Sequence, residues 1–229
     1  MVSMGDVICP ICHDKSGQFD DYGKRKRVLC HHCHSLERTR AMADMWTRYI
    51  GGAFGLRGKK GLIVSPSSSE RMFFRNQGLS DITTLDIRAE VEPDIQGDLC
   101  EADFLPDDTY HFIYASYVFP FLHDYQKALW HIRRVLKTDG IFVNFVPVHN
   151  RRPTIHHQVG AENSGWYGKE NFEKYNIGEY TTFGDLGVIE DHARFFIVKT
   201  LYGRDIVSGK DFCFLCCYPK EAARMIRAD

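Results

Sequence analysis

Two pairs of cysteines near the N-terminus constrain the fold of this chain more than any other feature. Cys9 and Cys12 form one Cys-x-x-Cys pair, Cys30 and Cys33 form a second, and 17 residues separate the two pairs. A Cys-x-x-Cys turn presents two sulfur atoms to one ion, and tetrahedral Zn²⁺ takes four such ligands. The spacing predicts a zinc site with four protein ligands, which leaves no position for water and makes the ion structural. The alternative of four buried free thiols needs more apolar sequence than residues 5–34 contain.

Four histidines and a basic run lie in the same segment. A histidine in place of one thiolate would give a site with three cysteine ligands and one histidine ligand, so this set stays open as an alternative to four cysteines. The candidates are His13, His31, His32 and His34. The basic run from Lys24 to Arg27 is either a solvated turn between two short strands or a contact surface for nucleic acid.

Composition predicts a water-soluble chain with one domain of ordinary size and a small appendage. The chain has 229 residues, a formal net charge of -1 and no apolar run long enough for a membrane span. Its first ten residues, MVSMGDVICP, lack the basic and apolar regions of a secretory signal, so we expect a cytoplasmic protein that does not contact a membrane. Cysteines outside the two pairs lie in apolar sequence, which suits a reducing compartment.

Apolar patterns after residue 58 alternate between strand and helix, and this predicts an α/β domain with a parallel sheet. The expected strands are 61–64, 82–86, 110–116, 141–146, 193–201 and 212–218, and the expected helices are 35–50, 67–77 and 124–137. We expect three parts: a zinc-binding head at 1–36, a connecting helix and linker at 37–58, and a domain at 59–229 that contains a long insertion at 149–191. An insertion of this length is typical of a functional loop or lid.

Two stretches resemble a known family. CPICHDKSGQFDDYGKRKRVLCHHCHSLERTR, from Cys9 to Arg40, resembles the zinc-bearing head of some class I S-adenosylmethionine-dependent methyltransferases. The stretch from Leu85 to Val148, with its "ALWHIRRVLKTDG" helix end and closing "VPV", is similar to the core of that family. The resemblance implies a doubly wound, mostly parallel Rossmann-like sheet behind a small zinc ribbon. It also implies methyl transfer from S-adenosylmethionine to an oxygen or nitrogen acceptor.

The resemblance also implies where the cofactor binds. Asp86 ends a predicted strand and is expected to accept hydrogen bonds from the ribose hydroxyls, as acids do in dinucleotide folds, although a turn-capping role fits it as well. Asp98 and Leu99 match the adenine-binding position of the family. Ser116 ends a third predicted strand and is also expected to contact the cofactor. The turn after the first strand has no glycine and is expected to contact the cofactor through Ser65, Pro66, Ser67 and Ser68.

One departure from the family pattern affects catalysis. Many relatives have Ser-His-Val-Leu-Glu-His after the third strand, whereas residues 116–121 of this chain read SYVFPF. The missing acid and the glycine-free turn leave open a catalytically degenerate binding or scaffold protein. The zinc head and the run from Lys24 to Arg27 leave open an enzyme that modifies RNA held by that head. The expected acceptor is a small molecule, a glycan or RNA, and the sequence does not identify which. The sequence also does not indicate an oligomeric state.

The expected general base comes from a motif that resembles the substrate side of the same family. It runs from Phe183-Gly184 to Asp191-His192 and Arg194. His192 has a near-neutral ordinary pKa, so it is our first choice for the proton acceptor, with Asp191 or Glu190 orienting its ring. His149, just beyond a predicted strand, and Tyr117 are the other candidates. A structural role is the competing interpretation for each histidine.

Overall fold

The structure is a computed structural model that describes residues 7–52, 55, 57–79, 81–149 and 151–220. The chain passes repeatedly between two units. The first consists of Met1–Gly58, Pro66–Ser80 and Thr200–Phe214, and the second of Lys59–Ser65, Asp81–Lys199 and Leu215–Asp229.

The first unit contains a cysteine-bearing hairpin and two helices. Its elements are β1 (Phe19–Tyr22), β2 (Arg25–Cys30), α1 (Glu37–Met45), the π-helical turn η1 (Trp46–Ile50), α2 (Ser68–Asn76), the end of β11 and the start of β12. Strands β1 and β2 are antiparallel. The indole ring of Trp46 packs edge-on against Phe74, with ring centroids 5.4 Å apart, and against Phe73 at 6.0 Å. These aromatic contacts hold α1 and η1 against α2.

The helix starts in this unit differ in how they are capped. Ser67 caps α2 in a capping box with Glu70, in agreement with the serines that open the predicted helix. The predicted helix 35–50 begins at Glu37 with Leu36 as its N-cap residue, so the hydroxyl of Ser35 does not cap α1. The hydroxyl of Ser35 instead contacts the sulfur atoms of Cys9 at 3.5 Å and Cys33 at 3.2 Å.

A buried arginine of α1 connects three segments of the first unit. The guanidinium of Arg40 is fully buried and donates to the carboxylate of Asp205 at 2.7 and 3.1 Å. It also donates to the carbonyl oxygens of Val28 at 2.9 Å and Ser35 at 2.6 Å. These bonds join the cysteine-bearing segment to α1 and to the turn between β11 and β12.

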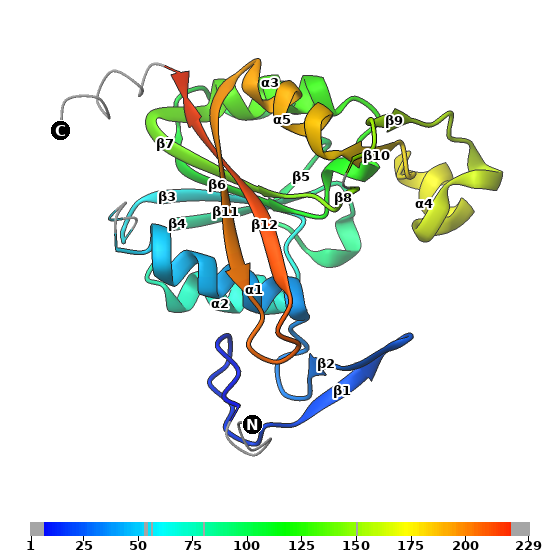
Figure 1. The fold of residues 1–229 in the computed structure, drawn as a ribbon. Coiled ribbons are helices and arrows are strands. Elements are labelled where there is room, and N and C mark those ends of the chain that lie inside the picture. The colour runs from blue at the N-terminus through cyan, green and yellow to red at the C-terminus, as the bar shows by residue number, and fades with distance from the viewer. Residues whose placement is uncertain (1–6, 53–54, 56, 80, 150, 221–229) are drawn as a thin grey trace. The chain divides into compact units, whose positions relative to one another are not determined.

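The central sheet has seven strands in the order β11-β12-β7-β6-β3-β4-β5 (Figure 1). Its strands are β3 (Lys60–Val64), β4 (Asp81–Asp86), β5 (Ile95–Gln96), β6 (Tyr110–Ser116), β7 (Leu136–Phe145), β11 (Phe196–Arg204) and β12 (Asp211–Pro219). The five neighbouring strands β7, β6, β3, β4 and β5 are parallel to one another, and β12 is antiparallel to β7. This arrangement confirms the predicted doubly wound, mostly parallel sheet.

Helices α3 (Tyr125–Val135) and α5 (Asp185–Ala193) lie on the same face of this sheet (Figure 1). The inner side of α3 is fully buried in the core, as its apolar spacing predicts, through Ala128, Leu129, Ile132 and Val135. The predicted bounds of this helix and of the strand after it are wrong, because α3 ends at Val135 and not at 137, and β7 begins at Leu136 and not at 141. The backbone becomes extended at Leu136, and β7 runs from there through Phe145, with an irregularity opposite Tyr110 and Phe112.

The expected insertion contains regular structure. A small sheet of order β8-β10-β9 is formed by β8 (Val148–His149), β9 (Ile155–His156) and β10 (Thr181–Gly184). Strand β10 is parallel to β8 and antiparallel to β9. The excursion between β9 and β10 carries the short turns η5 (Ala161–Asn163) and η6 (Gly165–Tyr167) and the helix α4 (Gly168–Tyr175). Three further short turns of the second unit are η2 (Ala89–Val91), η3 (Leu99–Phe104) and η4 (Phe119–Phe121).

Candidate cofactor site and cysteine cluster

The order of the central sheet reverses at β3, which pairs with β4 on one side and with β6 on the other. Ligands of open α/β sheets bind at such a switch point, beyond the carboxyl ends of the strands. Ser65, Asp86 and Ser116 lie at these ends, because Val64 is in register with Leu85 and Ala115. The second unit therefore brings three of the predicted cofactor residues to one edge of its sheet.

Ser65 takes the backbone conformation that glycine favours in such turns. Its φ is 48°, in the left-handed region, and its amide donates to the carbonyl oxygen of Leu85 at 2.8 Å. A serine here holds this conformation at a cost, and strained positions of this kind cluster at functional sites. Ser67 and Ser68, which follow Pro66, open α2 in the other unit.

Asp86 is 2% exposed and already has a partner, which the sequence did not indicate. Both of its carboxylate oxygens accept hydrogen bonds from the guanidinium of Arg88, at 3.0 and 2.9 Å. The amide of Arg88 donates to the same carboxylate at 3.0 Å. The hydrogen bonds to Asp86 raise the pKa of Arg88. A ligand that hydrogen-bonds to Asp86 must therefore replace or share this bidentate pair.

Asp98 and Leu99 lie on the loop after β5. One carboxylate oxygen of Asp98 accepts from the amide of Cys100 at 2.8 Å, and the other lies 3.7 Å from Nδ1 of His123. Asp98 therefore caps η3 with one oxygen and turns the other toward a half-exposed histidine. The side chain of Leu99 is 3% exposed and packs into the core of the second unit.

Ser116 carries a polar group that lacks a partner. Its hydroxyl is buried at the carboxyl end of β6, and within the described part of the chain no atom forms a hydrogen bond with it. Buried hydroxyls are nearly always hydrogen-bonded, so such an exception calls for an explanation such as an absent ligand or water. Its position at the switch point fits a polar ligand at this edge.

Tyr117 is the next residue along the chain and is also strained. Its φ is 60° and its side chain is 42% exposed. The ring of Tyr117 lies 5.8 Å from that of Phe121, which in turn meets Tyr167 edge-on at 4.8 Å. The segment after β6 thus presents an aromatic surface where the family pattern has a carboxylate and two histidines.

The structure does not favour His192 as a general base. The residue lies in the last turn of α5, its ring is fully buried, and both ring nitrogens have partners. Nδ1 lies 2.7 Å from the backbone carbonyl oxygen of Val188, and Nε2 lies 3.0 Å from the side-chain amide nitrogen of Asn144. Burial lowers its pKa to about 4. A buried ring whose two nitrogens both have partners is not placed to take a proton from a substrate. We therefore assign His192 a structural role in place of the expected role of general base.

His149 and Asp191 also take definite positions. His149 ends β8, pairs with Gly184 of β10 and has an exposed side chain, so it remains accessible to a substrate. Asp191 does not orient His192, because its carboxylate accepts a 2.5 Å hydrogen bond from the hydroxyl of Tyr125. Tyr125 lies on α3, so this bond joins α3 to α5.

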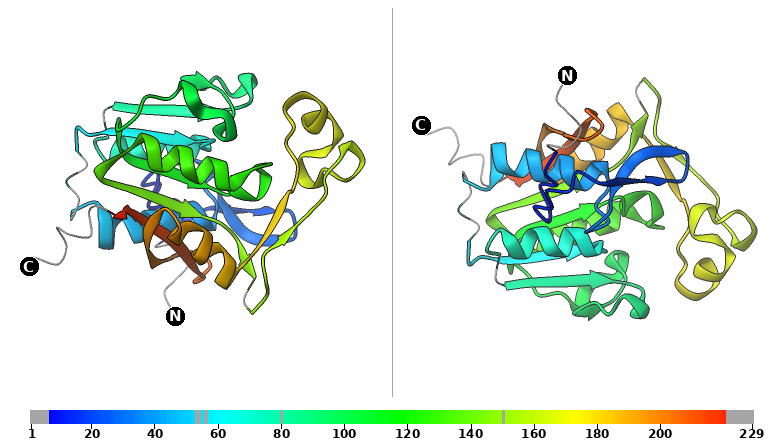
Figure 2. Two further views of the ribbon diagram at one scale, coloured as in Figure 1. Left: turned by 90° about the horizontal axis from the view of Figure 1, so that it is seen from above. Right: turned by 90° about the horizontal axis from the view of Figure 1, so that it is seen from below.

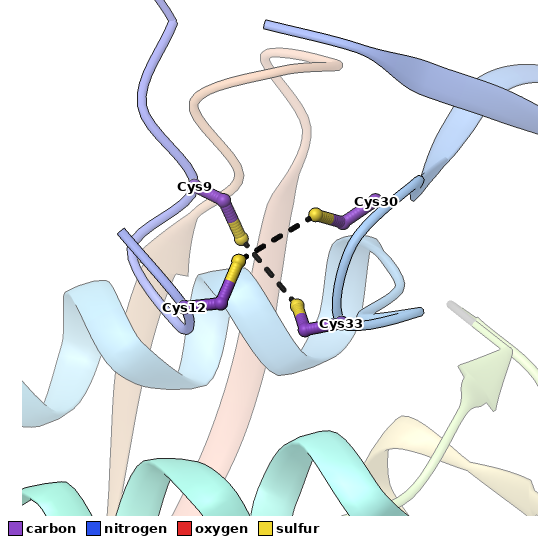
Figure 3. A group of neighbouring side chains, drawn as sticks. All are labelled: Cys9, Cys12, Cys30 and Cys33. Carbon is purple, nitrogen blue, oxygen red and sulfur yellow. Dashed lines mark hydrogen bonds between the residues drawn. The ribbon is translucent and has the colours of Figure 1, made fainter. Parts of the chain in front are cut away.

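The four cysteines of the two pairs converge in the first unit (Figure 3). Their sulfur atoms all lie within 4.8 Å of one another, with Cys9 and Cys33 3.7 Å apart and Cys12 and Cys30 3.8 Å apart. Four sulfur atoms around tetrahedral Zn²⁺, each at about 2.3 Å from the ion, lie about 3.8 Å from one another. The separations therefore match a zinc site with four cysteine ligands.

The two Cys-x-x-Cys turns have the same backbone geometry. In each, the residue after the second cysteine takes a left-handed conformation, with φ of 60° at His13 and 57° at His34. The amide of each of these histidines donates to the carbonyl oxygen of the first cysteine of its pair, at 2.8 and 2.9 Å. All four histidines of this segment have exposed side chains. The cluster therefore contains four thiols and no imidazole.

The basic run lies on β2 and the turn before it, and acidic side chains pair with part of it. Lys26 lies 2.6 Å from Asp21, and Arg25 lies 2.5 Å from Glu37. Part of the positive charge that would contact nucleic acid is therefore neutralised within the unit.

Comparisons with known proteins agree with this geometry. Residues 69–144, about a third of the chain, match the family model described as a methyltransferase domain. A search of curated proteins gives no match. A Burkholderia thailandensis 1,6-didemethyltoxoflavin-N1-methyltransferase, solved with 1,6-didemethyltoxoflavin and S-adenosylhomocysteine, is 15% identical. The match covers 77% of this chain and 81% of that one, with a TM-score of 0.52.

Two further solved structures share the fold. A candidate sarcosine dimethylglycine methyltransferase from Galdieria sulphuraria is 15% identical, with a TM-score of 0.51 and coverage of 89% of this chain and 94% of that one. A geranyl diphosphate methyltransferase in complex with GPP and sinefungin is 9% identical, with a TM-score of 0.51 and coverage of 81% and 79%. The domain match and these likenesses show the Rossmann-like fold of class I methyltransferases.

Across the described residues, no helix has the length and apolar character that crossing a membrane requires.

Proposed function

We propose that this chain transfers a methyl group from S-adenosylmethionine to an oxygen or nitrogen atom of an acceptor. The observation that carries the proposal is the polar edge at the switch point. There the buried carboxylate of Asp86 and the unpartnered hydroxyl of Ser116 lie at the ends of β4 and β6, the two neighbours of β3. Buried polar groups at this place suit a ligand with hydroxyl and amine groups.

Different residues at this edge contact different parts of the cofactor. Asp86 accepts from the ribose hydroxyls once Arg88 gives up part of its bidentate pair. Asp98 accepts from the exocyclic amine of adenine with the oxygen that does not cap η3. Ser65 and Ser116, which belong to the same unit, contact the remainder of the ligand. Bound S-adenosylmethionine supplies an electrophilic methyl group on a positively charged sulfur.

The acceptor must lose a proton as its oxygen or nitrogen is methylated. His149 is our choice for the base, because its imidazole is exposed at the end of β8. Tyr117, exposed beside Ser116, is the second choice. Methyl transfer depends mainly on alignment of the two reacting atoms, so a chain without the carboxylate of its relatives retains a route to catalysis.

We also propose that Cys9, Cys12, Cys30 and Cys33 hold one structural Zn²⁺ as thiolates. The sulfur separations and the paired turn geometry support this assignment. Four protein ligands leave no open coordination position, so the ion stabilises the first unit and takes no part in methyl transfer.

Isothermal titration with S-adenosylhomocysteine tests the proposed cofactor binding without knowledge of the acceptor. Wild-type protein should bind it, and Asp86→Asn should weaken binding by about 1–3 kcal/mol through lost hydrogen bonds to a charged acceptor. Asp81→Asn is the matched control, because Asp81 is an exposed residue at the opposite end of the same strand. A wild-type protein that binds neither the cofactor nor its product would favour the scaffold alternative.

A further inference from the structure

The second unit contains a hollow that lies next to the predicted ribose and adenine contacts. Its volume is about 620 Å³, and its lining includes Ile87, Gln96 and Gly97. Ile87 directly follows Asp86, and Gly97 directly precedes Asp98. The two loops are held together, since the amide of Gly97 donates to the carbonyl oxygen of Asp86 at 3.0 Å. The inner side of this hollow thus consists of the two loops that carry the predicted cofactor acids.

The outer side of the same hollow comes from α4. Phe172, Glu173, Lys174, Tyr175 and Asn176 line it. Figure 2 shows α4, in yellow, at the side of the sheet toward which the arrows of the parallel strands point. The insertion between β8 and β10 therefore reaches the edge where the cofactor is expected.

Three contacts hold α4 and the residue before it to the segment that follows Asp86. The hydroxyl of Tyr175 donates to the carboxylate of Glu90, and the ammonium of Lys174 lies 3.8 Å from the same carboxylate. The hydrogen bond from Tyr175 lowers the pKa of Glu90, so this carboxylate stays charged. Ahead of the helix, the ring of Tyr167 lies 5.9 Å from the guanidinium of Arg88.

The base of the insertion has its own anchor near β6. The amide of Tyr180 donates to the carbonyl oxygen of Pro120 at 2.8 Å, and the hydroxyl of Tyr180 donates to the side-chain oxygen of Asn176 at 2.6 Å. Asn176 ends α4 in a left-handed conformation with φ of 54°. The exit from α4 is therefore fixed to the segment after β6, whereas Lys174 and Tyr175 reach Glu90 through exposed or half-buried side chains. Such contacts are weak enough to open and close.

We propose that α4 belongs to the cofactor site: it forms the outer wall of the adenosine subsite, and the Tyr175–Glu90 hydrogen bond is a latch that slows entry and release of the cofactor. This inference rests on the proposed function, which places adenosine between Asp86 and Asp98. Arg88 couples the two, because it contacts both Asp86 and the ring of Tyr167. When ribose hydroxyls bind Asp86, they displace Arg88 in part. The contact between Arg88 and Tyr167, the residue before α4, then changes.

The test compares Tyr175→Phe with wild-type protein in two measurements. The first is the dissociation rate of S-adenosylhomocysteine, followed by stopped-flow displacement. Removal of one hydrogen bond from the closed state should raise this rate about 3- to 10-fold. The second is amide hydrogen exchange of residues 168–175 in the free protein, which should become faster by a similar factor. Glu162→Gln is the control, because it breaks an ion pair between Lys169 and η5 that lies outside the hollow.

The two measurements separate the inference from the proposed function. If wild-type protein binds S-adenosylhomocysteine and Tyr175→Phe releases it at the wild-type rate, the latch is refuted and the proposed function stands. If wild-type protein does not bind the product, the proposed function fails and α4 is no longer a wall of a cofactor site. Unchanged exchange of α4 in Tyr175→Phe would refute the latch in either case. Faster release and faster exchange in Tyr175→Phe alone would support it.

Discussion

Replacement of Arg40 by methionine should destabilise the first unit more than any surface change. Arg40 and Asp205 are both fully buried, and the guanidinium also satisfies the carbonyl oxygens of Val28 and Ser35. Arg40→Met fills much of the same volume but leaves a buried carboxylate without its counter-ion. Loss of one partner of a buried ion pair typically costs about 3–5 kcal/mol. The hydroxyl of Ser208 still donates to Asp205 at 2.6 Å, so we expect the lower end of that range.

Urea unfolding followed by circular dichroism measures this cost. Arg48→Met is the matched control on the adjoining turn, because Arg48 pairs with Asp44 at the surface and such pairs contribute at most about 1 kcal/mol. The stability that the Arg40–Asp205 pair contributes also depends on pH. Burial raises its pKa, but hydrogen bonds from Arg40 and Ser208 outweigh burial and hold the pKa below its ordinary value. The stabilisation is therefore present above about pH 4 and is lost as the pH falls further. A loss below about 1 kcal/mol in Arg40→Met, equal to the control, would refute this reasoning.

The other predictions concern the cysteines, a histidine and a glycine. Purified protein should contain one equivalent of zinc by mass spectrometry, and Cys30→Ser should lose zinc to a chelator much faster; zinc-free wild-type protein would contradict this. His192→Gln should remove a pH dependence: with a folded pKa of about 4 and an unfolded value near 6.5, the stability of wild-type protein falls as the pH drops from about 6.5 toward 4. Equal urea midpoints at pH 7 and pH 5 in wild type would count against a buried neutral ring. Gly203→Ala should strongly lower the melting temperature, because its Cβ would lie 1.8 Å from the carbonyl oxygen of Ala41; an unchanged melting temperature would refute this close approach.

The sequence predicts the cysteine cluster and most of the sheet because both depend on local patterns. The spacing of the two Cys-x-x-Cys pairs is a local signal, and the structure confirms that the four thiols converge. Strands such as Tyr110–Ser116 and the buried side of α3 follow from runs of apolar residues. The doubly wound arrangement was implied by the family resemblance, since periodicity does not determine which strands are neighbours.

Contacts between distant segments explain where the sequence interpretation was wrong or incomplete. The position of His192 next to an active-site-like motif suggested a base, but α5 buries the ring against Asn144 of β7, which is 48 residues away in the chain. Ser35 was expected to lie in the helix 35–50, but it precedes α1 and its hydroxyl contacts Cys9 and Cys33. The pairing of Arg88 with Asp86 had a weak signal in the sequence, because an arginine two residues after an acid is common and only the turn geometry brings the two together.

A crystal structure of the wild-type protein with S-adenosylhomocysteine is the most direct test of the proposed cofactor site. We predict electron density for the ligand at the carboxyl ends of β3, β4 and β6. Its ribose should lie within hydrogen-bond distance of Asp86, its adenine amine should face Asp98, and Arg88 should have given up at least one of its two bonds to Asp86. A ligand bound elsewhere, or crystals that remain free of ligand at saturating concentration with the Asp86–Arg88 pair intact, would contradict the assignment of this edge as the cofactor site.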